Sequence, residues 1–191
     1  MNDTPARPAK TVESTRTILS ELIEPGDANY LGKAFGGAIL SKIDLCAYAT
    51  ASKFAGTICV TASFDKVDFH MPIEVGELVT LAGRVTYAGT TSVEVTIEIS
   101  SQNVMTGETR HTNTARVTMV AIRDGKPSPV PQLLPTSREE KIDYLLGRHR
   151  RERVRALDTE RLAARGRLEA VEETRLDELI GLKDLSSLLM A

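Results

Sequence analysis

Apolar residues dominate positions 38–52, and this stretch anchors the secondary-structure prediction. A helix over 36–52 would carry an apolar side chain on nearly every face, so we expect it to be buried on all sides. Asp44 lies in the middle of this helix. A carboxylate in such a place loses solvation, so it must be paired, shifted in pKa or kept for a reaction.

Alternating apolar and polar residues predict β-strands on both sides of the helix. Strands are expected at 14–24, 57–70, 79–87, 93–99 and 109–122. The order is one strand, the apolar helix and then four strands joined by short turns. A long antiparallel sheet wrapped around the helix satisfies this order, which places the chain in the α+β class.

Two of the predicted strands carry further detail. In the second strand, apolar residues share one face up to Phe64, and the alternation changes phase at Asp65–Lys66, which indicates a β-bulge or a bend between two sheet segments. In the fourth strand, Glu94, Thr96 and Glu98 predict one face in contact with water.

Composition changes along the chain and suggests its organisation. We expect a flexible or surface-draped N-terminus at 1–12, one domain at 13–125, a proline-rich linker or strap at 126–135 and charged amphipathic helices at 136–191. The basic cluster at 148–155 is typical of a solvated helix face, with contact to a phosphate or another subunit as the alternative.

Charge and cysteine usage narrow the class of protein. A net charge of −2 argues against binding nucleic acid through bulk electrostatics. No apolar run approaches the roughly 20 residues of a membrane span, and the first residues lack a signal sequence. Cys46 and Cys59 lie in apolar stretches without metal-ligand spacing, so buried free thiols and a cytoplasmic location are expected.

The Gly36–Gly37 pair at the start of the helix is the first candidate for chemistry. It lacks both nucleotide-binding fingerprints. Glycine at a helix N-terminus exposes unpaired N–H groups, which could hold a developing oxyanion. Close packing of the helix on the sheet is the equally supported alternative.

Three further residues have both a chemical and a structural interpretation. Asp44 could act as a general base on water or attack a carbonyl directly, or it could be a buried structural carboxylate. Asn29 could hold water or the scissile carbonyl, although turn formation is the simpler role. His70 is a lone histidine, more typical of a packed or surface residue than of a metal ligand.

Three motifs in these stretches resemble the hotdog-fold acyl-CoA thioesterases, in the branch of bacterial YciA and the mammalian cytosolic and brain enzymes. They are GG-x(6)-D at the helix start, F-H-x-P-I-x-V-G-E-L from Phe69, and G-T-T-S-V-E-V from Gly89. The resemblance covers about residues 14–123. Many relatives carry His before the glycine pair, where this chain has Phe35, as in the YciA-like branch.

The resemblance implies a hotdog domain that forms homodimers, often as trimers of dimers, with the active site at the dimer interface. It implies Asp44 as the catalytic aspartate, Asn29 as its partner across the interface and Gly37 as an oxyanion donor. Gly36, Phe69, His70, Thr91 and Ser92 would line the substrate channel.

The expected activity is hydrolysis of acyl-CoA to free CoA and a carboxylic acid. No metal or separate cofactor is expected, because coenzyme A is part of the substrate. The alternatives are a hotdog enzyme acting on acyl carrier protein thioesters or enoyl-CoA, and a non-catalytic acyl-CoA sensor.

Overall fold

The computed structural model describes residues 7–65, 67 and 71–181. The chain divides into two compact units, Met1–Gly147 and Arg148–Ala191. A β-sheet and the helix α1 (Gly36–Ala55) make up most of the first unit, and the second unit is helical. None of the helices in the described ranges has the length and apolar content that crossing a bilayer requires.

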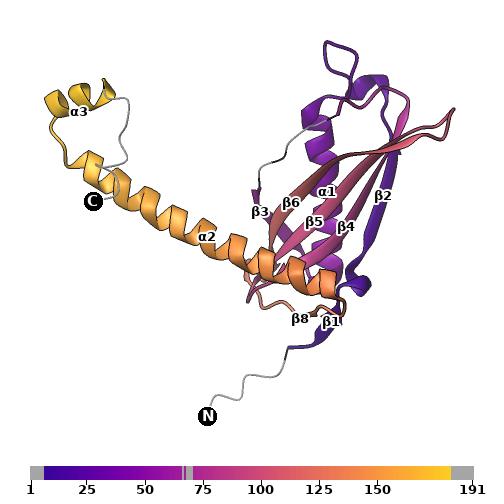
Figure 1. Cartoon of the computed structure of the whole chain (residues 1–191). Helices are drawn as coiled ribbons and strands as arrows, with labels where there is room; N and C mark the ends of the chain where they lie inside the picture. Colours follow the sequence, from indigo (N-terminus) through magenta and orange to yellow (C-terminus); the bar gives the residue numbers. More distant parts are fainter. Residues whose placement is uncertain (1–6, 66, 68–70, 182–191) are drawn as a thin grey trace. The chain divides into compact units, whose positions relative to one another are not determined.

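The main sheet is antiparallel, and its strands follow the order β2-β4-β5-β6-β3. Their bounds are β2 (Thr17–Leu22), β3 (Cys59–Phe64), β4 (Glu77–Ala88), β5 (Ser92–Asn103) and β6 (Thr109–Arg123). A short sixth strand, β7 (Lys126–Pro127), pairs with β6. Figure 1 shows the long strands passing across α1. The α+β prediction is therefore confirmed, and this arrangement of one helix held by an antiparallel sheet is the hotdog fold.

A glycine in the middle of β4 allows α1 to lie close to the sheet. A Cβ atom at Gly83 would lie 2.6 Å from Thr50 Oγ1 and 3.0 Å from Cys46 Sγ. Cys46 is fully buried, Cys59 is also buried, and both are free thiols, as expected. Burial raises the pKa of each thiol, and these side chains act as small apolar residues at the helix–sheet contact.

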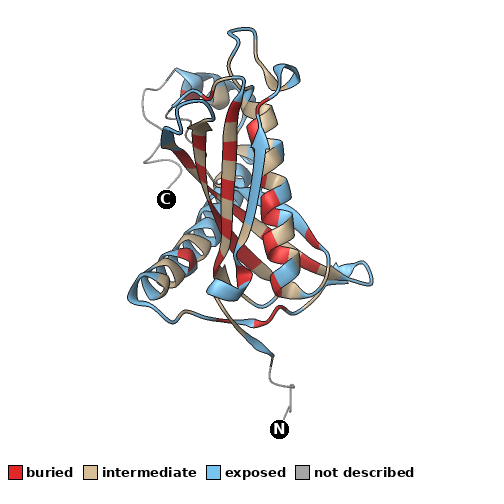
Figure 2. Ribbon diagram, turned by 90° about the vertical axis from the view of Figure 1, so that its right-hand side faces the viewer, coloured by how far each residue is buried: buried red, intermediate tan, exposed pale blue. Residues whose placement is uncertain are grey.

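The prediction that α1 is buried on all sides is wrong for the single chain. One side is buried through Ile39, Ile43 and their neighbours, but Leu45 is 58% exposed and Tyr48 is 43% exposed. Figure 2 shows buried and exposed positions on α1. The sheet covers only one side of the helix, so the apolar sequence of the other side has no partner among the described residues of this chain. Helix α1 runs three residues beyond the expected end and stops at Gly56, whose φ of 69° is the left-handed conformation that glycine favours at a helix end.

The edge strand β3 also differs from the prediction. Its register against β6 shifts between Thr61 and Ser63, which places a bulge at Ala62. The phase change predicted at Asp65–Lys66 extends outside the described residues. The apolar face that begins at Ile58 and Val60 is exposed, by 61% and 46%. The strand ends at Phe64, and the expected continuation through residues 66 and 68–70 lies outside the described residues.

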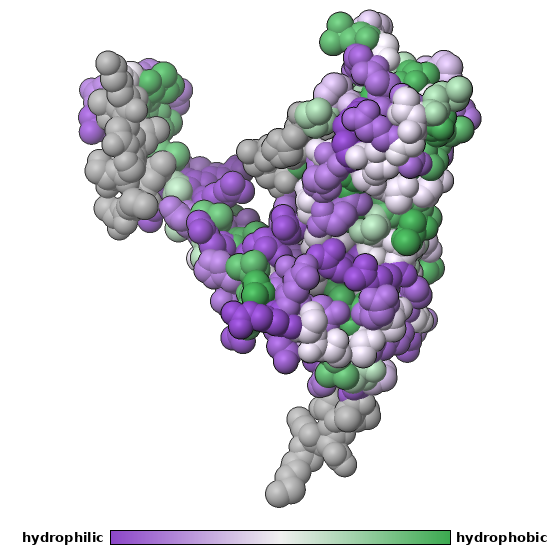
Figure 3. All heavy atoms as spheres, turned by 45° about the vertical axis from the view of Figure 1, so that its right-hand side comes forward, coloured by the Kyte–Doolittle hydropathy of each residue, from purple (hydrophilic) through white to green (hydrophobic). Residues whose placement is uncertain are grey.

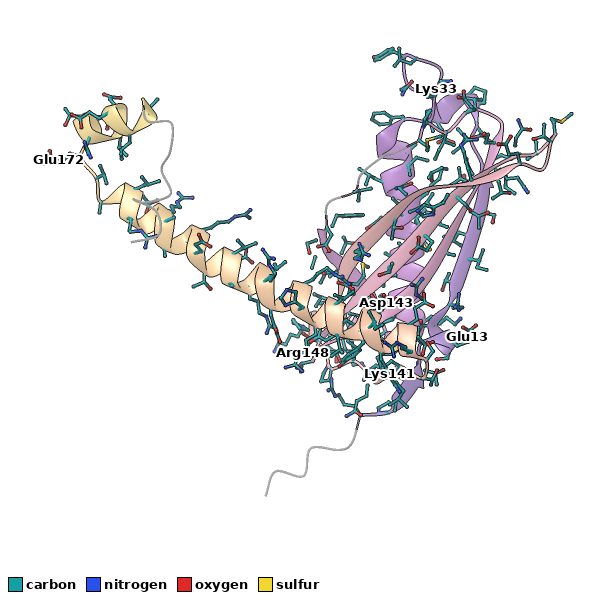
Figure 4. All side chains as sticks on the ribbon, in the orientation of Figure 1. Glu13, Lys33, Lys141, Asp143, Arg148 and Glu172 are labelled. Atoms are coloured by element: carbon teal, nitrogen blue, oxygen red, sulfur yellow. The ribbon has the colours of Figure 1, made fainter. Side chains whose placement is uncertain are left out.

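The outer face of the sheet is less solvated than the sequence pattern indicates. Glu94 and Thr96 are buried, at 7% and 3% exposure. The first part of α2 (Arg138–Glu169) covers this region: a Cβ at Gly147 would lie 2.9 Å from Glu94 Oε1, and the Tyr144 ring lies 5.2 Å from that of Tyr87. The carboxylate of Asp143, labelled in Figure 4, accepts a 2.9 Å hydrogen bond from Arg84. The first part of α2 thus buries a face of β5 that the sequence of the strand predicts to be in contact with water.

The two ends of the first unit meet in a small parallel sheet. Strand β1 (Ala9–Thr11) pairs with β8 (Gln132–Leu134), which occupies the proline-free triplet between Pro131 and Pro135. Lys10 donates from Nζ to the carbonyl of Phe54 at 2.7 Å, which places a cation at the C-terminal end of α1. Before β2, which is shorter than expected, the chain forms the 3₁₀ turn η1 (Glu13–Thr15).

The second unit contains the remainder of α2 and α3 (Glu173–Ile180). Within residues 136–181, the part of the charged extension that the structure describes, the chain forms two helices. Leu157 and Leu162 are exposed, while Leu168 and Leu176 line a cavity between the helices.

We predict that Gly83→Val lowers the free energy of unfolding by roughly 2–4 kcal/mol, because overpacking would push α1 away from β4. Urea unfolding measures this loss. Gly26→Ala is the matched control, since no atom lies within 4 Å of the added Cβ and the residue has an ordinary φ. Equal stability of Gly83→Val and wild type would show that the helix–sheet contact tolerates the extra volume.

Candidate active site

Asp44 is half-buried on α1 and faces the edge strand. Its Oδ1 accepts a hydrogen bond of 2.5 Å from Thr61 Oγ1, and no described residue donates to Oδ2. Thr61 Oγ1 also lies 3.3 Å from the sulfur of Met119 on β6. The carboxylate is therefore held in one orientation by its neighbour on β3, with one oxygen left for a ligand.

No basic residue within the described ranges pairs with Asp44. The nearest lysine along the helix, Lys42, is turned to the other side, where its Nζ lies 2.9 Å from Glu21 and 3.6 Å from Asp27. Burial acts to lower the pKa of Lys42, but these two carboxylates outweigh it and raise the pKa. Lys42 thus joins α1 to β2 and to the turn η2 (Pro25–Asp27), and leaves the Asp44 side of the helix free.

The first turn of α1 provides unpaired N–H groups. Phe35 is the N-cap residue and makes no side-chain cap, and no described residue accepts a hydrogen bond from the amides of Gly36 or Gly37. A Cβ at Gly37 would lie 2.3 Å from the Phe35 ring of the preceding loop, so the predicted close packing of the glycine pair on the sheet finds no contact here. The amides without a described acceptor lie at the positive end of the helix.

The loop before α1 is shaped by Asn29. Its Oδ1 accepts hydrogen bonds from the amides of Leu31 at 2.8 Å and Lys33 at 3.2 Å, so the predicted turn role is confirmed. These bonds use the carbonyl side of the amide. The Nδ2 group donates to no described residue, so the side chain retains two donors in a fixed orientation.

A cavity of about 440 Å³ lies beside this loop. It is lined by Asn29, Leu31, Lys33, Ala34, Gly36, Ile39, Met71, Pro72 and Ile73. Lys33, labelled in Figure 4, lies in the loop above the start of α1. The cavity therefore places Asn29 and the first helical glycine in one hollow with apolar walls.

Glu77 and Arg110 form an ion pair that holds the wall of the cavity at Pro72. Both terminal nitrogens of the Arg110 guanidinium donate to the Glu77 carboxylate at 2.7 Å, and one of them also donates to the carbonyl of Pro72 at 3.0 Å. Burial acts to raise the pKa of Glu77, but the hydrogen bonds from Arg110 and from the Glu74 amide outweigh it, and the pKa lies below its ordinary value. Glu77 is the glutamate of the F-H-x-P-I-x-V-G-E-L motif, and the structure assigns it to this clamp.

The predicted site residues fall into separate groups. Asn29 and Gly36 share the cavity, with Gly37 next to them, whereas Asp44 lies two turns further along α1 and outside the cavity lining. Thr91 precedes β5, and Ser92 is its first residue. The next residue, Val93, pairs with Met119, which pairs with Thr61. Two strand spacings of about 4.8 Å separate Val93 from Thr61 by roughly 10 Å, and Thr91 and Ser92 lie at about this distance or beyond. Phe69 and His70 lie outside the described residues.

Thr61 was not among the site residues predicted from the sequence. A threonine within a strand carries no signal of its own, because threonine is common in strands. Only the pairing of β3 against the helix shows that its hydroxyl reaches Asp44. In the described part of the chain, no group of three acidic, histidine or cysteine residues is arranged to hold a metal ion.

Comparison with known proteins identifies the family. Residues 31–108 match the thioesterase superfamily. An uncharacterised acyl-CoA thioester hydrolase of Bacillus subtilis, YkhA, is 36% identical over 129 residues, covering 67% of this chain and 75% of its own. This chain belongs to the thioesterase superfamily.

Solved structures agree with this assignment. A hexameric acyl-CoA thioesterase superposes with a TM-score of 0.75 at 43% identity, over 79% of this chain and 97% of its own. An acyl-CoA hydrolase from Staphylococcus aureus, solved with butyryl-CoA, CoA and CoA disulfide, has a TM-score of 0.76 at 34% identity, over 85% and 99% of the two chains.

The Staphylococcus aureus hydrolase has also been solved as three alanine variants. One replaces an asparagine, one an aspartate and one a threonine. In that protein the aspartate lies 15 residues after the asparagine, and the threonine lies 17 residues after the aspartate.

For the Glu77–Arg110 clamp, we predict that Glu77→Gln lowers the free energy of unfolding by roughly 2–4 kcal/mol at neutral pH. Because the pKa of Glu77 is lower in the folded chain than its unperturbed value of 4.5, the ion pair contributes fully above pH 4.5. Its contribution is lost as pH falls through the lower, folded pKa. The stability difference between wild type and Glu77→Gln should therefore shrink as pH falls below 4.5.

Chemical unfolding over a pH series measures this difference. Glu108→Gln is the matched control, because Glu108 is exposed on the neighbouring hairpin. A stability difference that stays constant down to the acid limit of folding would contradict the assigned ion pair.

Proposed function

We propose that this thioesterase hydrolyses acyl-CoA to free CoA and a carboxylic acid. The observation that carries the proposal is on α1. Thr61 orients the Asp44 carboxylate, whose second oxygen has no donor among the described residues, and the first two amides of the helix have no described acceptor. A thioester hydrolase needs an activator for water and donors for the oxyanion, and one helix holds both. The relatives described as acyl-CoA hydrolases support coenzyme A as the carrier.

In the proposed reaction, Asp44 takes a proton from water as the water attacks the thioester carbon. The amide of Gly37, with that of Gly36, stabilises the resulting oxyanion. When the tetrahedral intermediate collapses, the C–S bond breaks and the CoA sulfur leaves as a thiol with the proton that Asp44 took from water. Direct attack by Asp44, through a mixed anhydride that water then cleaves, consumes the same water and gives the same products.

Thr61 has a positioning role in this proposal. Its hydroxyl donates to Oδ1 of Asp44 and so directs Oδ2 toward the substrate. Asn29, Asp44 and Thr61 have the same separations along the chain, 15 and 17 residues, as the three residues replaced in the Staphylococcus aureus hydrolase. This agreement supports the choice of these three residues.

The spacing along α1 supports a site shared with a second copy of the chain. Asp44 follows Gly37 by seven residues, which corresponds to about 10.5 Å along a helix. One carbonyl cannot contact the Gly37 amide while its attacking water contacts Asp44 of the same helix. We therefore propose a composite site, in which Asn29 and the glycine amides of one chain face Asp44 and Thr61 of another.

Exposed apolar surface supports this assembly. Leu45 and Tyr48 on α1 and Val60 on the edge strand β3 are each more than 40% exposed, and among the described strands β3 pairs with β6 alone. An open apolar edge of this kind is a template for pairing with another strand. Figure 3 shows hydrophobic side chains gathered at several places on the first unit. A homodimer as the active unit, assembled as a trimer of dimers, accords with the hexameric relatives.

The remaining parts of the proposal concern the substrate. Thr91 and Ser92, with Phe69 and His70, would line the channel for pantetheine and nucleotide. Coenzyme A is part of the substrate, and the reaction as proposed needs no metal. A cytoplasmic location remains a prediction.

Acyl carrier protein thioesters, enoyl-CoA hydration and a sensor role are the alternative functions. Release of CoA thiol from acyl-CoA separates hydrolysis of this substrate from each of them.

We predict that Asp44→Ala lowers kcat for acyl-CoA hydrolysis by at least about 10³-fold, because the activator of water is lost. Thr61→Val should lower it by about tenfold or more, since the carboxylate loses its orienting hydrogen bond. Thiol release measures both. Glu98→Gln on the outer face of the sheet is the control, and full activity of Asp44→Ala would rule out the proposed mechanism.

Complementation tests the composite site. We predict that Asp44→Ala and Asn29→Ala homo-oligomers are each impaired, while co-expressed chains regain activity. If the chains pair at random, about half of the dimers are hybrids, and each hybrid has one intact site out of two. The mixture should therefore show about a quarter of the wild-type activity. Mixed chains with no more activity than the average of the two parents would contradict a site shared between copies.

A further inference from the structure

The cavity beside the start of α1 has an orientation and a lining that bear on substrate choice. We infer that it receives the acyl chain of the substrate, and that it selects uncharged acyl groups of limited length. This inference rests on the proposed function, and it concerns residues outside the proposed catalytic set: Ala34, Ile39, Met71, Ile73 and the Lys33–Glu74 ion pair.

Position is the first argument. Gly36 and Asn29, which belong to the oxyanion half of the proposed site, line the cavity. A thioester whose carbonyl oxygen meets the helix amides therefore has its acyl carbon at the cavity mouth. The acyl chain, which continues from that carbon, has an apolar hollow of about 440 Å³ directly beside it.

Rigidity is the second argument. The amide of Ala34 donates to the carbonyl of Ile73 at 2.8 Å, which joins the two walls of the cavity. A β-bridge and an ion pair between Lys33 and Glu74 join them again. Glu74 is in turn attached through its amide to Glu77 of the buried clamp, at 3.0 Å. The cavity is therefore preformed, and a preformed wall can discriminate by size.

Depth is the third argument. Ile39 and Ile73 are 2% and 4% exposed and belong to the core of the unit, so they form the closed end of the cavity. Met71 is 50% exposed and lies at the open side. Each methylene buried in such a hollow strengthens binding by about threefold to fourfold. Activity should rise with acyl length and then stop rising when the chain reaches the isoleucines.

Charge is the fourth argument. Lys33 is the one charged residue among the described residues that line the cavity, and its ammonium is committed to Glu74. An acyl chain that ends in a carboxylate would lose its hydration there without gaining a free cation. The cavity should therefore reject succinyl-CoA relative to butyryl-CoA, which has the same number of acyl carbons.

The size test uses Ala34→Leu and a panel from acetyl-CoA to dodecanoyl-CoA, with kcat/KM measured by thiol release. The added side chain takes the place of about three methylenes, so the ratio of octanoyl-CoA to acetyl-CoA activity should fall on the order of 50-fold. Ala156→Leu, on an exposed position of α2, is the matched control and should keep the wild-type ratio. Circular dichroism and the oligomeric state confirm that each variant is folded.

The charge test uses Glu74→Gln, which frees the Lys33 ammonium and leaves the Glu74 backbone hydrogen bond in place. The ratio of succinyl-CoA to butyryl-CoA activity should rise by about tenfold, as expected for a new charge-assisted hydrogen bond. This variant also keeps the inference testable if Ala34→Leu fails to fold.

The outcomes separate the two proposals. Turnover by wild type, with activity ratios that stay unchanged in both Ala34→Leu and Glu74→Gln, would overturn the cavity assignment alone. No turnover by wild type on any acyl-CoA would overturn the proposed function, and the inference with it. Ratios that change as expected in either variant, with the control unchanged, would support the cavity as the acyl site.

Discussion

The close contact between α1 and β4 is the constraint on which the rest of the first unit depends. At Gly83 a hydrogen atom occupies the place where any side chain would meet Thr50 and Cys46. This approach allows one face of the helix to be buried in the concave sheet. It also determines which residues of α1 face the edge of the sheet, and so brings Asp44 to Thr61 on β3.

The same packing leaves the opposite side of α1 uncovered. A helix with apolar residues on all sides cannot be satisfied by one sheet, and Leu45 and Tyr48 remain exposed together with the edge strand. The two proposed halves of the active site are separated along this helix by about two turns. The proposed second copy of the chain would cover this exposed apolar surface and complete the proposed site.

Polar contacts shape the region where the substrate would bind. Asn29 closes its own loop, the Lys33–Glu74 pair joins that loop to the next, and the Glu77–Arg110 clamp holds the second loop against β6. Glu77 is buried, and its charge is stabilised by the guanidinium, which donates to both carboxylate oxygens, and by the amide of Glu74. Apart from Asn29, the residues that fix the conformation of the cavity do not take part in the proposed reaction.

The sequence by itself determined the order of helix and strands, because alternation and the apolar run at 38–52 depend only on local periodicity. It also identified the start of α1 at Gly36, the buried thiols and the carboxylate at Asp44. The fold class followed from that order. The resemblance of three short motifs to known thioesterases supplied the activity, which periodicity alone could not.

Tertiary structure decided the rest. The burial of Glu94 by the first part of α2, the exposure of half of α1 and the position of the bulge at Ala62 all depend on which elements pack together, and local patterns carry no such information. For the same reason, the hydrogen bond from Thr61 to Asp44 could not be predicted from the sequence. The two residues are 17 positions apart, and they come into contact only because β3 lies beside α1 in the folded chain.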